Sequence, residues 1–227
     1  MLYTEESVKA NIRNREGKRV FYLGKGDQLT SGARDYLSRQ RIEILSADLA
    51  KPERYYLPGG GYVEEKPEHM THLRGDLLVS KCHPVIAFRG KLDSLQAELI
   101  LGQLDVPGER QRLGEILALS RQLIRCDVMQ EPVLLEKLCG YTEQELHSRS
   151  HYPQRYYEKA HFMPEAADGM KIARLNRLRC AAREAELAAA AAFTDADGNC
   201  TRTDMLQALN RMSSMLYVMM MENRNQP

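Results

Sequence analysis

The chain has 227 residues, with 32 Lys and Arg against 31 Asp and Glu and a formal net charge of +1. This near-neutral charge gives no electrostatic footprint for nucleic acid or anionic lipid, and no apolar run approaches the roughly 20 residues that a membrane helix needs. The first residues lack the basic and apolar regions of a secretory signal, so we expect a cytoplasmic protein.

Residues 1–45 alternate short helix and strand signals. Thr4 is placed to cap a polar helix that reaches about Asn14, and Thr30 to cap a helix over 31–39. The expected strands are 19–23 and 41–45. Together they predict a small α+β appendage, which is too small for us to expect it to be stable by itself.

Residues 46–68 are interpreted as a linker, because they contain three prolines and the run Gly59–Gly61. The glycine run is typical of a flexible joint. The alternative, a loop that cradles a phosphate, stays open, although no Gly-Lys-Ser/Thr sequence follows.

From residue 88 onward the apolar residues recur at helical spacing. The expected helices are 88–102, 109–127, 131–139, 142–148, 168–192 and 203–223. Thr142 and Glu145 have the spacing of a capping box. Residues 149–164, rich in His, Tyr and Pro, are expected to form an ordered functional loop, and 194–199 a polar turn.

The last helix carries an apolar stripe with alternating spacings of four and three. Its members are Met205, Leu209, Met212, Leu216, Met219 and Met220. Such a stripe suits the seam of a helical bundle. The fold class we predict is therefore mainly α, a helical bundle with a small N-terminal α+β appendage.

Two sets of polar residues on these helices are candidates for chemistry. Arg179, Arg183 and Glu186 share one helix face, where two guanidinium groups can clamp a polyphosphate. The alternative is a solvated face with helical ion pairs. Asn210 and Arg211 lie mid-helix beside the apolar stripe, either as ligand contacts or as a plain exposed pair.

Two further features are weaker. One is a cluster of nitrogen and sulfur donors suited to zinc or ferrous iron, formed by His69, His72, Cys82 and His83. Their spacing matches no strong metal signature. The alternative is that they are unrelated polar residues on an exposed segment. Phe162 precedes the long helix, where it acts either as a hydrophobic staple or as a wedge against a ligand.

Four separated stretches, taken together and in this order, carry a resemblance to a known family. They are KPEHMTHL at 66–73, KCHPVIAFRGKLDSLQ at 81–96, ARLNRLRCAAREAE at 173–186 and QALNRMSSMLY at 207–217. The chain resembles the cobalamin adenosyltransferases, most closely the EutT type that is found with ethanolamine utilisation.

The resemblance implies a trimer of helical bundles with ATP and cobalamin at the subunit interfaces, a dimer being the alternative. It implies binding or catalytic roles for residues that stand at the family's motif positions. These are Thr71, Lys81 and Asp93 for the nucleotide, Arg179, Arg183 and Glu186 on the basic helix, Asn210 and Arg211 on the last helix, and Phe162 against the lower face of the corrin.

The sequence also departs from the family pattern. Ser214 stands where the family's last motif has Asp, and no glycine-rich Thr-Arg-Thr-Gly-Asp loop is recognisable. Some relatives carry an H-x11-C-C-x2-C metal motif, of which only His69 and Cys82 remain, with His83 as a substitute. A requirement for Fe(II) or Zn is therefore open.

We predict an appendage and linker over 1–65 and an adenosyltransferase-like bundle over 66–227. The activity that the resemblance implies is transfer of the adenosyl group of MgATP to cob(I)alamin, with release of triphosphate, to supply ethanolamine ammonia-lyase. Microcompartment proteins are the further partners expected, with the microcompartment as an alternative location. The alternative function is a non-enzymatic helical scaffold that binds a corrinoid or a metal.

Overall fold

The computed structural model describes residues 1–15, 17–47 and 54–224. These residues form two compact units, Met1–Lys81 and Cys82–Pro227. The boundary expected from the sequence, between residues 65 and 66, falls inside the first unit, because residues on both sides of it pair in one sheet. Each unit is described separately.

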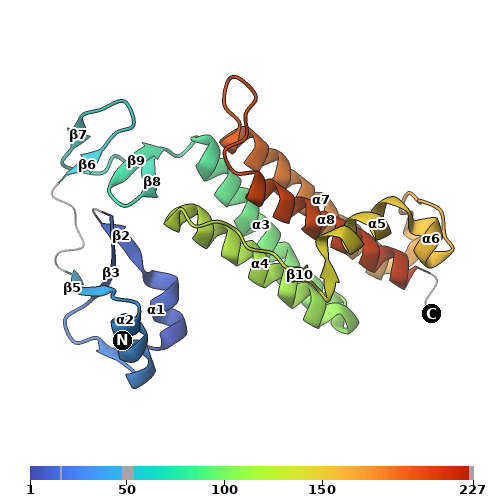
Figure 1. Ribbon diagram of the computed structural model, residues 1–227, viewed down its shortest axis with the longest axis horizontal. Helices are drawn as coiled ribbons and strands as arrows, with labels where there is room; N and C mark the ends of the chain where they lie inside the picture. The colour runs from blue at the N-terminus through green and yellow to red at the C-terminus, as the bar shows by residue number, and fades with distance from the viewer. Residues whose placement is uncertain (16, 48–53, 225–227) are drawn as a thin grey trace. The chain divides into compact units, whose positions relative to one another are not determined.

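The first unit begins with an α+β fold (Figure 1). Its elements are β1 (Leu2–Tyr3), α1 (Glu5–Asn11), β2 (Arg13–Arg15), β3 (Lys18–Leu23), β4 (Gln28–Leu29), α2 (Ser31–Arg39) and β5 (Glu43–Ser46). Strands β2, β3 and β5 form one sheet in that order, with β3 and β5 parallel across the α2 crossover.

Both predicted N-caps of this region are present. The hydroxyl oxygen of Thr4 accepts a hydrogen bond from the amide of Ser7, and that of Thr30 accepts one from Ala33, each at 3.3 Å. Helix α1 ends at Asn11 and not at Asn14, because residues 13–15 pair antiparallel with β3.

A second sheet in this unit has the strand order β7-β6-β9-β8. Its strands are β6 (Tyr55–Tyr56), β7 (Tyr62–Val63), β8 (Met70–Arg74) and β9 (Leu77–Ser80). The prediction of a linker over 46–68 is wrong for 55–63, which form a hairpin, while 48–53 lie outside the described residues. Gly60 and Gly61 have φ of +89° and +82°, so the turn explains these glycines without a phosphate.

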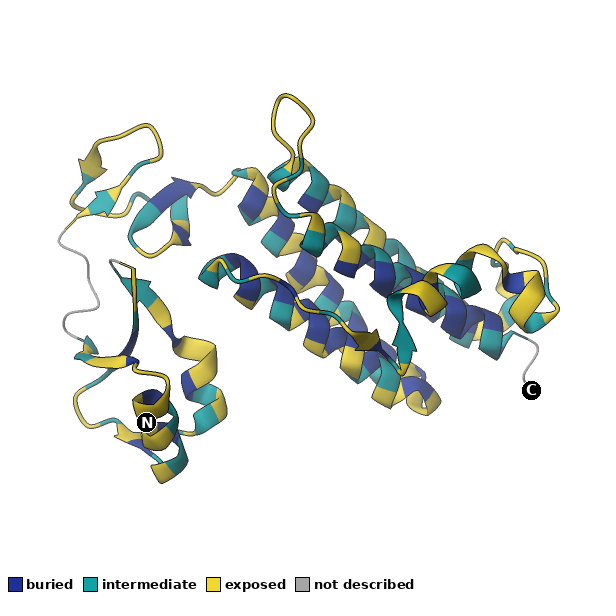
Figure 2. Cartoon of the chain, in the orientation of Figure 1, coloured by how far each residue is buried: buried dark blue, intermediate teal, exposed yellow. Residues whose placement is uncertain are grey.

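The second unit is a bundle of four long helices. They are α3 (Pro84–Asp105), α4 (Arg110–Met129), α7 (Gly169–Phe193) and α8 (Thr203–Asn223). Figure 2 shows buried residues along the inward faces of these helices, and they form one apolar core. All six apolar residues predicted along α8 are fully buried, which confirms the bundle seam.

Helix α3 begins four residues earlier than expected, at Pro84, whose fixed φ and missing amide proton suit a first helical position. It also packs closely on α7 near Gly102, where an added Cβ would lie 2.9 Å from Cδ1 of Leu178. Among the described residues, no helix has both the length and the apolar character needed to cross a membrane.

The segment between α4 and α7 contains β10 (Lys137–Leu138), β11 (Tyr141–Thr142), α5 (Glu143–His151) and α6 (Pro153–Tyr157). The predicted helix over 131–139 is wrong. Cys139 and Gly140 have φ of 52° and 84° and join β10 to β11 in a two-residue hairpin. The predicted capping box at Thr142 and Glu145 is present, and the expected loop 149–164 is partly helical.

Candidate functional site

Helix α7 carries two groups of polar side chains. On one face, Arg174 and Arg177 bind Glu98 of α3 with N–O distances of 2.8 and 3.3 Å, so these arginines are structural ion-pair partners. The other group contains Arg179 and Arg183. Arg183 is exposed and makes no ion pair with any residue that the structure describes. Its guanidinium is therefore available to an anion.

Arg179 is half-buried and is oriented by a neighbour on its own helix. Its Nε and Nη2 donate to Oδ1 of Asn176 at 3.2 and 3.1 Å. The amide oxygen of Asn176 carries no full charge, so this contact orients the guanidinium without neutralising it. Arg179 thus keeps its charge for a ligand.

Helix α8 runs beside α7 and supplies matching polar residues. Nδ2 of Asn210 donates to Oε1 of Glu186 at 3.1 Å. Burial raises the pKa of the Tyr217 phenol, and the positive charge of Arg179 acts in the opposite direction, which places that guanidinium within electrostatic reach of the phenol. We call the aligned residues Arg179, Arg183, Glu186, Asn210 and Tyr217 the α7–α8 stripe.

Arg211 is only 7% exposed and supports this stripe from within the bundle. Its Nη1 donates to the carbonyl of Glu143 at 3.2 Å, and its Nη2 donates to Oδ1 of Asn210. The amide oxygen of Asn210 is thereby held by Arg211, and its NH₂ group is directed to Glu186. Because Arg211 is buried, the structure favours an indirect role in which it orients Asn210, and its part in ligand binding stays a prediction.

Ser214, the departure from the family pattern, is also buried, at 8% exposure. Its Oγ accepts a hydrogen bond from Oγ of Ser150 at 3.3 Å. A carboxylate here would be costly without a charged partner. Serine places an uncharged hydroxyl at this buried position.

Phe162 lies against the C-terminal part of α8. Its ring is 6.3 Å from the ring of Tyr217, with an interplanar angle of 28°, and Cζ of Arg224 lies 4.0 Å from its centroid. The structure therefore connects Phe162 to the α7–α8 stripe through Tyr217. It is half-buried, so part of the ring stays accessible.

The other predicted nucleotide ligands are Asp93 in the second unit and Thr71 and Lys81 in the first. The Asp93 side chain is exposed on α3 and makes no hydrogen bond or ion pair with a residue that the structure describes. Thr71 lies on β8 opposite Val79, and Lys81 binds Glu68 at 3.0 Å, both in the first unit. Lys81 lowers the pKa of the Glu68 carboxyl through this contact. The roles of Asp93, Thr71 and Lys81 stay predictions.

The predicted transition-metal ligands are divided between the two units, with His69 and His72 in the first and Cys82 and His83 in the second, and their role stays a prediction. His83 caps α3, because its Nδ1 accepts from the amide of Val85 at 3.2 Å, and Cys82 is exposed. Throughout residues 1–15, 17–47 and 54–224, no group of three or more His, Cys, Asp or Glu could hold a metal ion. We derive no step through Fe(II) or Zn.

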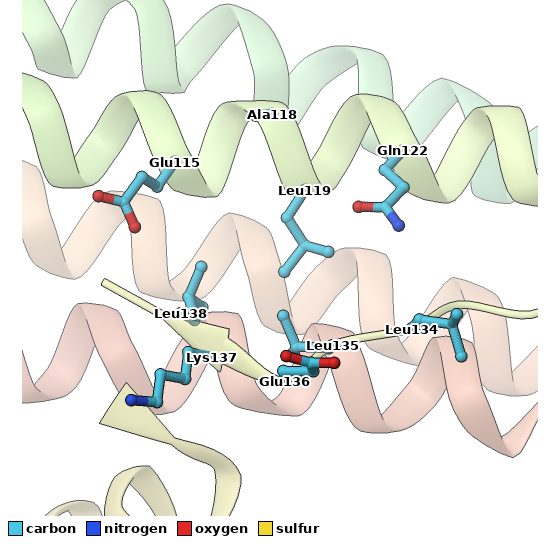
Figure 3. A pocket seen from close by; sticks show the side chains of 9 residues that line it. All are labelled: Glu115, Ala118, Leu119, Gln122, Leu134, Leu135, Glu136, Lys137 and Leu138. Atoms are coloured by element: carbon cyan, nitrogen blue, oxygen red, sulfur yellow. The ribbon is translucent and has the colours of Figure 1, made fainter. Parts of the chain in front are cut away.

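A groove of about 560 Å³ lies between α4 and the segment that leads into β10, shown in Figure 3. Its lining is Glu115, Ala118, Leu119, Gln122, Leu134, Leu135, Glu136, Lys137 and Leu138. It contains none of the predicted site residues. A second groove, of about 550 Å³, includes His151 and His161 and lies next in sequence to Phe162.

Sequence reasoning did not single out Tyr217, His161, Asn176 or Arg224. Tyr217 stands seven residues after Asn210, which places both on one face of α8. That spacing could have revealed it, but a tyrosine beside an apolar stripe is indistinguishable from a core residue by pattern alone.

The comparisons with known proteins agree with this architecture. The family model for cobalamin adenosyltransferase matches residues 61–222. Corrinoid adenosyltransferase EutT of Salmonella typhimurium strain LT2 is 34% identical, over 96% of this chain and 90% of that protein. The protein of the same name from Escherichia coli K12 is 38% identical over the same shares. No solved structure matches the chain.

Proposed function

This chain belongs to the cobalamin adenosyltransferase family, and we propose that it transfers the 5′-deoxyadenosyl group of ATP to cob(I)alamin for use by ethanolamine ammonia-lyase. The observation that carries the proposal is the α7–α8 stripe. It presents two arginines that have no carboxylate partner among the described residues, next to an ordered Glu186–Asn210 pair and the aromatic pair Phe162–Tyr217.

The reaction is a nucleophilic displacement. The electron pair of Co(I) forms the bond to C5′ of the ribose, the C5′–O5′ bond breaks, and triphosphate leaves with that electron pair. Cobalt changes formally from +1 to +3. The corrin supplies the nucleophile, so the protein has to align ATP with the cobalt and stabilise the leaving group.

Stabilisation of the triphosphate is assigned to Arg179 and Arg183. Guanidinium groups present paired N–H donors that match phosphate oxygens, and their charge opposes the negative charge that develops on the leaving oxygen. Lys81 is proposed to add a further charge, and Mg²⁺ to enter as the complex with ATP. Glu186 and Asn210 are proposed to orient the nucleotide, with Thr71 and Asp93 as further nucleotide ligands.

Phe162 is proposed to act on the other substrate. The family resemblance assigns this phenylalanine to the lower face of the corrin, where it displaces the lower axial base. The resulting four-coordinate Co(II) is easier to reduce to the nucleophilic Co(I) state. The partial exposure of Phe162 supports this role.

The activity is tested by mixing the protein, without oxygen, with chemically reduced cobalamin and MgATP. We expect the corrin spectrum to change to that of light-sensitive adenosylcobalamin, with one triphosphate released per corrinoid. Corrinoid binding without product would contradict the activity and favour the scaffold alternative. Parallel reactions with Fe²⁺, with Zn²⁺ and with a chelator test the metal requirement: activity that the chelator abolishes and that Fe²⁺ or Zn²⁺ restores would show it.

We propose that the protein works as a homo-oligomer. Helix α3 exposes Ile100, Leu101 and Leu104, which are 45%, 47% and 63% accessible. An apolar row of this kind on the outside of a bundle supports self-association. Light scattering coupled to size-exclusion chromatography distinguishes the expected trimer from the alternative dimer. Association with ethanolamine microcompartment proteins is a further proposal that pull-down with those shell proteins would test.

A further inference from the structure

The segment that carries Phe162 is fixed to the C-terminal end of α8. Nζ of Lys159 donates to the carbonyls of Met221 and Arg224 at 3.4 and 2.8 Å. Carbonyls in the last turn of a helix have no partner within the helix, so a cation is well placed there. The segment is thus anchored three residues before Phe162.

A second anchor is His161. Its Nε2 lies 3.2 Å from the carbonyl of His151, and its Nδ1 lies 2.9 Å from the phenol oxygen of Tyr217. The carbonyl can only accept, so Nε2 carries a proton, and in the neutral ring Nδ1 accepts from the phenol. Burial raises the pKa of Tyr217, which keeps the phenol protonated for this donation.

Phe162 itself contacts two side chains of this end of the bundle. Tyr217 stacks on it, and the guanidinium of Arg224 lies over its ring. Arg224 is in turn held by Asp168, with 3.5 Å between Nε and Oδ1. Stacked aromatic rings and a cation over a ring face are both attractive, so these contacts restrict the rotation of Phe162.

We propose that Tyr217 and Arg224 are positioning residues that hold Phe162 in the orientation needed to displace the lower axial base of cobalamin. This inference rests on the proposed function. A wedge that competes with a ligand for a metal position has to resist being pushed aside. A ring fixed before the substrate binds has already lost the rotational freedom that a free side chain would lose on binding.

A positioning role and a purely structural role of these residues predict different reaction rates with two corrinoids, cobalamin and cobinamide. Cobinamide has no lower axial base and holds only a weakly bound water in that position, so its adenosylation depends much less on the displacement. Loss of the Tyr217 or Arg224 contact should therefore impair reaction of cob(II)alamin, in the presence of a reductant, much more than reaction of cob(II)inamide. A merely structural defect would impair both equally.

The variants are Tyr217→Leu, which removes the ring, Tyr217→Phe, which keeps it, and Arg224→Gln. Tyr141→Phe is the matched control, because its phenol is also half-buried and donates to a side chain, Glu222 at 3.1 Å. Arg224 is 31% accessible at its side chain, so its replacement is tolerated by the fold and keeps the test informative if Tyr217→Leu unfolds.

We expect Tyr217→Leu and Arg224→Gln to lower kcat for cobalamin by about tenfold relative to kcat for cobinamide, a factor worth about 1.4 kcal/mol. The absorbance and electron paramagnetic resonance signals of four-coordinate Co(II) should fall in the same variants. Tyr141→Phe should keep the wild-type ratio and the signal, and Tyr217→Phe should lie between wild type and Tyr217→Leu, because it keeps the stacked ring but loses the hydrogen bond to His161.

Equal losses with both corrinoids, or an unchanged four-coordinate signal in Arg224→Gln, would overturn the proposal. A wild-type protein that adenosylates neither corrinoid would instead contradict the proposed function. The two failures are therefore distinguishable in one set of measurements.

Discussion

At the scale of single residues, the structure separates arginines that the sequence presents as equivalent. Arg177 and Arg179 are two positions apart on α7. Arg177 is shared between two carboxylates, Glu98 and Glu184, while Arg179 donates its side-chain hydrogen bonds, among the described residues, to the neutral amide of Asn176. A guanidinium already paired with carboxylates gains little from a phosphate. This contrast supports the proposed phosphate-binding role of Arg179 and Arg183.

Replacement of Arg179 by Ala should lower kcat/KM for ATP by about 100-fold, the usual cost of removing one donor to a developing negative charge. Arg177→Ala is the matched control, since it removes an arginine two residues away whose partners are Glu98 and Glu184. We expect it to change kcat/KM by less than about threefold. Steady-state kinetics of triphosphate release provides the measurement, and equal kinetics for wild type and Arg179→Ala would rule out the phosphate role.

Arg211 and Arg183 should differ in what their loss does to stability. Arg211→Ala leaves the Glu143 carbonyl and the Asn210 amide oxygen without their donor in a buried place, so we expect the free energy of unfolding to fall by about 3 kcal/mol. Arg183→Ala removes an exposed side chain and should change it by less than about 0.5 kcal/mol. Urea unfolding measures both, and similar values for the two variants would contradict the positioning role of Arg211.

At the scale of elements, the N-terminal capping box of helix α5 contains a titratable carboxylate, that of Glu145. Hydrogen bonds from the backbone amide and the side chain of Thr142 lower the pKa of Glu145 below 4.5. A carboxyl whose pKa is lowered by folding stabilises the folded state above its ordinary pKa, and this contribution is lost as the pH falls through the folded pKa.

The comparison of wild type with Glu145→Gln isolates this effect, because glutamine keeps an acceptor for the capping box but does not titrate. Above pH 4.5 wild type should have the higher urea midpoint, and the difference between the two proteins should shrink as the pH is lowered further. A difference that is constant across this range would show that the charge of Glu145 does not support the helix.

Elements with long apolar periodicity were predicted well, and short helices were predicted where an N-cap residue marked their start, as Thr30 does for the helix over 31–39. The stripe from Met205 to Met220 predicts α8 because its inward positions repeat over about four turns. The stretch 131–139 has too few residues for such a signal, and its hairpin depends on Cys139 adopting a positive φ, which its residue type does not predict. Likewise, the spacing of Arg179, Arg183 and Glu186 identified one face, but the contact between Phe162 and Tyr217 is tertiary and left no local pattern.

At the scale of the whole molecule, the family match and the compact units do not share a boundary. The family model begins at residue 61, whereas the first compact unit extends to Lys81. The sheet of β6 to β9 therefore belongs to the N-terminal compact unit. Most of the same sheet, however, lies within the residues that the family model matches together with the bundle. The EutT relatives cover 96% of the chain, so they share the appendage too. This argues that the appendage belongs to this branch of the family.

Each unit has its own buried apolar residues, which predicts that each can be destabilised separately. Leu37 in α2 is 1% exposed and Leu95 in α3 is fully buried, so alanine at either position should cost about 3 kcal/mol in its own unit. Calorimetry of the wild type should show a thermal transition with two components. Leu37→Ala should lower the midpoint of one component and Leu95→Ala that of the other, because the substitutions lie in different units. A single transition that both variants shift by the same amount would show instead that the chain unfolds as one cooperative body.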